Sequence, residues 1–68
     1  MKLIEAEAAA KKANINAVAA FINENGKEYD QVSIQVLKES LMAAYLNEIK
    51  DEEMDQHIFS NIQRIANL

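Results

Sequence analysis

The feature that most constrains the fold of this chain is its lack of turn-forming residues: its 68 residues include one glycine, Gly26, and no proline. Strand-rich folds need such residues at regular intervals to reverse the chain. Half of the residues are hydrophobic, which is ample for a packed core and excludes a disordered chain. We therefore predict an all-α fold in a single helical domain over residues 1–68, with three helices near 3–25, 31–49 and 52–67.

The first predicted helix, 3–25, is dominated by alanine, the residue with the highest helix propensity. Lys11 interrupts its apolar stripe, and the segment KKANIN at 11–16 is the point at which this helix can kink or break. The pair Asn25-Gly26 predicts the end of the helix, because glycine readily adopts the left-handed conformation that closes a helix.

Residues 31–36, QVSIQV, permit a second interpretation, because polar and apolar side chains alternate there with the period of a half-buried strand. The longer stretch VSIQVLKESL resembles the strand-to-helix junction of the ribbon-helix-helix family of DNA-binding regulators. That resemblance implies a DNA-reading strand whose outward side chains are Gln31, Ser33 and Gln35.

Charge and helical periodicity argue against this strand. The chain has a net charge of −4, with seven basic and eleven acidic residues, whereas affinity for DNA comes largely from neutralising phosphates. Val32, Val36 and Leu37 also fit helical stripes as well as they fit the alternation. We therefore predict that residues 31–36 begin the second helix, with Asp30 as its N-cap, and that the protein has no nucleic-acid partner.

The second predicted helix, 31–49, carries two apolar stripes, so it belongs in the middle of an assembly. One stripe contains Val32, Val36, Ala43 and Leu46. We assign the other stripe to a homodimer interface, because two flanking helices of so small a chain cannot cover both sides of this helix. The predicted interface residues are Ile34, Leu37, Leu41, Met42 and Tyr45.

Side chains suited to catalysis or metal binding are scarce. There is no cysteine, and the single histidine, His57, cannot form a zinc site even with Glu53 four residues before it. A lone Gly26 cannot make a phosphate-binding loop, and the serines lack a nucleophile signature. We therefore predict a protein that is not an enzyme, with no catalytic residue, no metal site and no cofactor.

One charged feature stands out, an acidic cluster formed by Glu48, Asp51, Glu52, Glu53 and Asp55. Helix capping explains much of it, with Asp51 as the N-cap of the third helix and two glutamates in its first turn. The cluster can also serve as a docking patch for a basic protein partner.

The opening sequence MKLIEAEAAAKK lacks the uninterrupted apolar run of a signal peptide, and no stretch approaches the roughly 18 apolar residues of a membrane span. We expect a soluble, acidic, cytoplasmic protein that does not contact a membrane. The sequence favours a small non-enzymatic interaction module that acts as a homodimer, as a regulator, an inhibitor or an assembly factor. The alternative is a DNA-binding regulator of the ribbon-helix-helix type.

Overall fold

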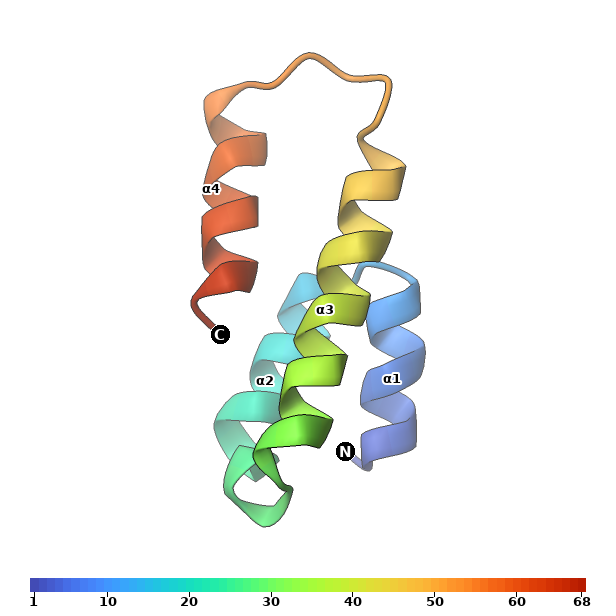
Figure 1. Cartoon of the computed structure of the whole chain (residues 1–68), viewed down its shortest axis with the longest axis vertical. Coiled ribbons are helices and arrows are strands. Elements are labelled where there is room, and N and C mark those ends of the chain that lie inside the picture. The colour runs from blue at the N-terminus through green and yellow to red at the C-terminus, as the bar shows by residue number, and fades with distance from the viewer.

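The computed structural model describes all 68 residues and contains only helices and their connections. The four α-helices are α1 (Leu3–Lys11), α2 (Ile15–Asn25), α3 (Gln31–Glu48) and α4 (Gln56–Ala66), as Figure 1 shows. A single 3₁₀ turn, η1 (Gly26–Glu28), continues α2 toward α3. The predicted all-α class is confirmed, with four helices in place of the predicted three.

The strand interpretation of residues 31–36 is wrong, because these residues form the first turns of α3. Asp30 caps the helix: its Oδ1 accepts a hydrogen bond from the backbone N–H of Ser33 at 2.7 Å. That cap satisfies one of the backbone donors that a helix start leaves unpaired, and apolar residues at helical spacing follow it. The alternation of QVSIQV is therefore part of a two-sided helical pattern.

The single helix predicted over 3–25 is instead two helices, separated inside the KKANIN segment. Ala13 has a left-handed backbone (φ 57°) and follows the last residues of α1. The N–H groups of Ala13 and Asn14 donate to the carbonyls of Ala10 and Ala9 at 3.0 and 2.9 Å, which is the Schellman pattern of helix termination. The Asn14 side chain then caps α2 by accepting from the N–H of Ala17. By contrast, Gly26 is right-handed (φ −59°), so its predicted left-handed conformation is wrong.

Ala13 occupies a position that usually holds glycine, and this predicts a stabilising substitution. A left-handed backbone costs an L-residue about 1–2 kcal/mol, whereas the greater chain entropy that glycine loses on folding is about 0.5–1 kcal/mol. Ala13→Gly should therefore raise the free energy of unfolding by about 0.5–1 kcal/mol in urea denaturation. The matched control is Ala8→Gly on the exposed side of α1, which should lower it by about 1 kcal/mol. Loss of stability in both variants would show that Ala13 carries no strain.

A second prediction concerns the Asp30 cap. The hydrogen bond from the Ser33 backbone holds the pKa of the Asp30 carboxyl below its ordinary value. Because the pKa is lowered by folding, the contribution of the charged cap is complete above the ordinary value and is lost as pH falls through the folded value. In Asp30→Asn, the asparagine side chain can still accept from Ser33 but cannot titrate. Relative to this variant, the wild type should lose Tm more steeply between about pH 5 and about pH 2. Parallel Tm curves for the two proteins would contradict this role.

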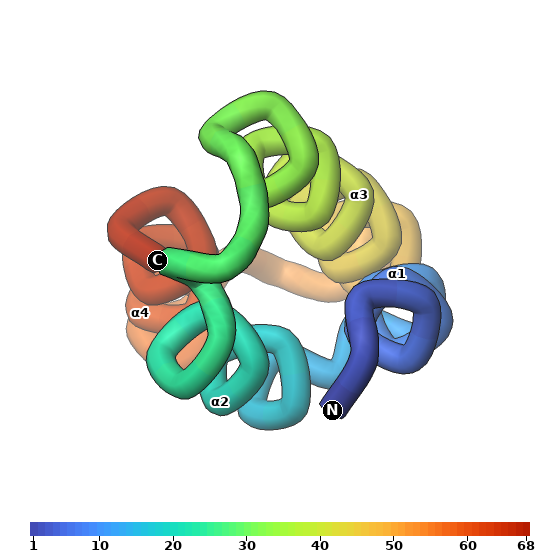
Figure 2. Tube along the Cα trace, turned by 90° about the horizontal axis from the view of Figure 1, so that it is seen from below, coloured from blue at the N-terminus to red at the C-terminus, as the bar shows by residue number.

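The core is a single cluster to which every α-helix contributes. Viewed end-on, α2 lies across the bundle from α3, and α1 and α4 lie on either side between them (Figure 2). The alanine-rich α1 contributes Ala6 and Ala10, both fully buried, so its small side chains let it pack closely on its neighbours. Phe21 of α2 packs against Tyr29, with ring centroids 5.4 Å apart. The buried residues are Ala6, Ala10, Val18, Phe21, Ile34, Leu37, Leu41, Tyr45, Ile58 and Ile65.

The last helix begins later than predicted, because Asp55 rather than Asp51 is its N-cap. Asp55 Oδ1 accepts from the N–H of Ile58 at 2.9 Å, and the segment between α3 and α4 forms a turn and an extended connection. With this start, Ile58 and Ile65 are buried. The side-chain amide of Asn61 also donates to the hydroxyl of Tyr45 at 3.1 Å, which joins α4 to α3.

Candidate interaction surface

The five residues predicted to form a dimer interface lie on the inner side of α3. Ile34, Leu37, Leu41 and Tyr45 are buried within the single chain, and Met42 is half-buried. They are covered because α3 is packed by α1, α2 and α4 on that side. In the single chain these four side chains are therefore covered by the other helices, and they contribute to its core.

The stripe that the chain leaves uncovered is the other one. Val32, Val36 and Leu46 expose 72%, 56% and 44% of their surface, and Glu39 and Ala43 between them are also exposed. Positions 32, 36, 39, 43 and 46 are separated by alternating steps of four and three residues, so they lie in one line along α3. We call these five residues the α3 outer face, and it points away from the buried stripe of the same helix.

Helix α1 extends this apolar surface on one side. A groove of about 180 Å³ runs between α1 and α3, lined by Leu3, Glu7, Val32, Ser33, Val36 and Leu37. Ile4 exposes 73% of its surface and lies one turn before Glu7 on α1. Leu3 of α1 and Val32 and Val36 of α3 thus border a common groove, and Ile4 is not among its lining residues.

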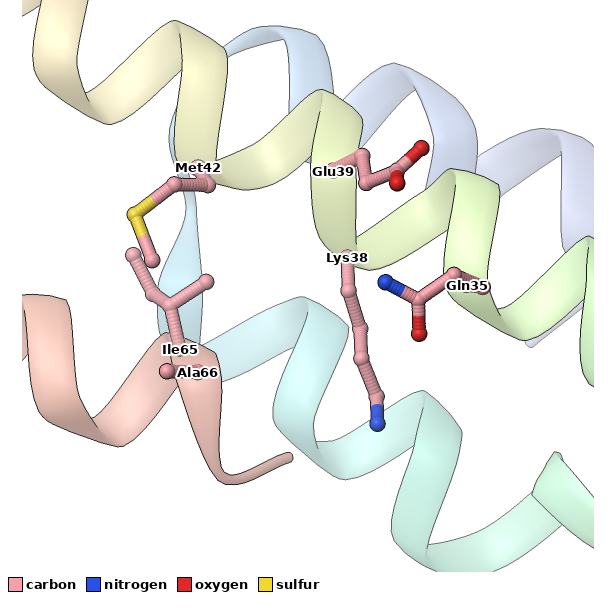
Figure 3. Close-up of a pocket in the computed structure, with 6 residues that line it drawn as sticks. All are labelled: Gln35, Lys38, Glu39, Met42, Ile65 and Ala66. Atoms are coloured by element: carbon pink, nitrogen blue, oxygen red, sulfur yellow. The ribbon is translucent and has the colours of Figure 1, made fainter.

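On the other side, α3 meets α4 at a second small groove (Figure 3). Its lining residues are Gln35, Lys38, Glu39, Met42, Ile65 and Ala66. The Met42 and Ile65 side chains point toward one another and close the groove at one end, and Lys38 extends across it. The carboxylate of Glu39 points away from the Lys38 side chain (Figure 3). Glu39 is exposed and is the charged member of the α3 outer face.

The acidic residues gather at the far end of α3. Glu48 is the last residue of α3, and Asp51, Glu52, Glu53 and Asp55 lie in the connection to α4. All five are exposed, as is Met54 among them. Asp55 is engaged as a helix cap, whereas Asp51, the predicted cap, is part of a turn.

The structure brings few chemically active groups together. His57 is exposed, and its Nε2 lies 3.4 Å from the side-chain nitrogen of Asn61. Glu53 precedes α4, so it does not share a helical face with His57. Nowhere do three or more His, Cys, Asp or Glu side chains gather in an arrangement that could hold a metal ion. None of the four helices combines the length and the apolar character needed to cross a membrane.

Comparison with protein-family models, with curated proteins and with solved structures finds no match to this chain. The interpretation of its function therefore depends on its own residues. The sequence identified both stripes of α3, but it did not show which of them the other helices cover. The usable signals were side-chain size and charge, because the buried stripe holds Ile, Leu and Tyr residues, whereas the α3 outer face holds two valines, an alanine, a leucine and a glutamate.

Proposed function

We propose that this chain is a protein–protein interaction module that acts as a homodimer through the α3 outer face. The observation that carries the proposal is the line of exposed Val32, Val36 and Leu46 at helix-pairing spacing. Apolar side chains that recur in alternating steps of three and four residues form the seam along which two helices pack. A regulator, an inhibitor or an assembly factor can be built on such a module.

The size of the domain supports association. Ten of the 68 residues are buried, so the core of one chain is small. Domains near this size hide only about 60% of the surface of the unfolded chain, and a partner subunit is one of the usual remedies. Pairing two outer faces removes the same valines and leucine from water in both subunits, so each apolar contact stabilises the dimer twice.

The α3 outer face also has a suitable border. The residues beside it on one flank are Ser33, Ser40 and Asn47, and on the other Gln35 and Met42. None of these flanking side chains is charged, so Glu39 is the one charged group along the seam. By contrast, a DNA-reading strand is absent, because Gln31, Ser33 and Gln35 belong to α3.

The test of the dimer is Val36→Asp. This exposed position can accept a charge without disturbing the core, but the aspartates would be desolvated in a dimer. Light scattering after a sizing column should give the wild type twice the chain mass of 7.7 kDa and the variant the single mass. The Tm of the wild type should rise with protein concentration, whereas the Tm of Val36→Asp should not. Asn16→Asp, which adds the same charge at an exposed position of α2, is the control and should remain dimeric. A wild-type mass of 7.7 kDa at tens of micromolar would contradict the proposal.

A basic protein partner for the acidic cluster is a second proposal, favoured by the exposed Met54 among exposed carboxylates. Acidic side chains around one apolar side chain suit a basic surface that also has an apolar anchor. Neither Glu52 nor Glu53 caps a helix, so both can be changed without loss of structure. Replacing both by Gln should weaken binding of a lysine-rich peptide and reduce its salt dependence, as measured by fluorescence anisotropy. Equal binding by Glu24→Gln and by the double variant would count against this patch.

A further inference from the structure

The charges on and beside α3 define how two copies would be oriented. We infer that the two α3 helices of the dimer run antiparallel, with Val36 of each subunit opposite Leu46 of the partner subunit. This inference rests on the proposed function, because it takes the α3 outer face as the seam. It follows from two electrostatic features of α3 and from the order of residues along its outer face.

The first feature is Glu39, near the middle of the seam. If the helices paired in parallel and in register, the two Glu39 carboxylates would lie directly opposite each other in a partly dry interface. Like charges at such a position repel, and burial strengthens the repulsion. In the antiparallel arrangement Glu39 faces Ala43 of the partner subunit, four residues away from the partner's Glu39. At 1.5 Å per residue this displaces the carboxylates by about 6 Å along the axis, and the small alanine leaves them access to water.

The second feature is the acidic cluster at the C-terminal end of α3. Glu48, Asp51, Glu52, Glu53 and Asp55 surround a single cation, Lys50. Parallel pairing would place two such clusters side by side. Antiparallel pairing places Glu48 opposite the partner's Ile34, 14 residues from the partner's Glu48, so the clusters begin about 21 Å apart along the axis. That separation exceeds the screening length of about 8 Å at physiological salt, so the repulsion is removed.

The order of residues then fixes the register. With Val36 opposite the partner's Leu46, Glu39 lies opposite the partner's Ala43, and Val32 lies beyond the last residue of the partner's α3, Glu48. The apolar residues Val36, Ala43 and Leu46 of the α3 outer face are then all used along the seam. The same contacts occur twice about a two-fold axis, as a closed dimer requires.

Cysteine cross-linking tests the orientation directly, because the chain has no cysteine of its own. Val36→Cys and Leu46→Cys would be prepared separately, oxidised alone and oxidised as an equal mixture. A disulfide needs Cα atoms within about 7 Å, which the antiparallel register supplies only between position 36 of one subunit and position 46 of the other. We expect the mixture to give a band of twice the 7.7 kDa chain mass on a non-reducing gel, and each variant alone to remain at the single mass.

The outcomes separate this inference from the proposed function. Cross-linking of Val36→Cys with itself would show parallel helices and overturn the inference, while the dimer through α3 would stand. A dimer in light scattering that gives no cross-link in any sample would place the interface elsewhere and overturn both. If light scattering showed a monomer, the proposed function would be overturned, and with it the inference that depends on it.

A second experiment measures the dimer Kd of Glu39→Leu, which should change only if Glu39 lies in the interface. Leucine at the seam buries apolar area in both subunits and removes the only charge within it, so the dimer Kd should fall by about tenfold or more. Glu24→Leu, at an exposed position of α2, should leave the Kd unchanged. An unchanged Kd for Glu39→Leu would show that Glu39 lies outside the interface and would overturn the inference.

Discussion

The packing of one side of α3 against the three other helices is the interaction on which the whole structure depends. Leu37 and Leu41 are almost completely buried at the centre of this packing, and α3 is the only helix that has extensive contacts with all the others. Because α1, α2 and α4 are each short, none can form a stable helix alone in water. Their stability comes from the apolar surface that α3 offers them.

Side-chain caps determine where three of the four helices begin, and these caps differ in how readily the sequence reveals them. Asp30 was predicted correctly, because it stands alone before a long helical pattern. The start of α4 was predicted wrongly, because Asp51 and Asp55 are equally good caps by residue type. In the structure Asp55 is the cap, and Ile58 and Ile65 of the helix that follows are buried. The break at Ala13 had only a weak local signal, because its left-handed residue is not a glycine.

The candidate interaction surface likewise has one part that the sequence reveals and one part that depends on the packing of the whole chain. Helical periodicity showed that α3 is apolar on two sides, and this part of the prediction depends only on spacing along one helix. The choice of the exposed side depends on where α1 and α4 lie, which is a property of the whole chain. The break between α1 and α2 matters here, because the chain reverses there, so that α1 and α2 both pack against α3 and α1 buries Ala6 and Ala10 (Figure 1). A continuous helix over 3–25 could not have covered the inner stripe in this way.

The outer face and the acidic connection can then be understood together. A small domain that exposes a line of valines and a leucine risks unspecific association, since any apolar surface can meet it. Charged side chains can restrict how two copies associate. They do so without destabilising the monomer when they are exposed there and repel one another only in an incorrect pairing. Glu39 within the proposed seam and the carboxylates beyond its end would both have this property. In the proposed dimer, the acidic connection, which gives no more than one cap to the fold, would limit the ways in which two copies can meet.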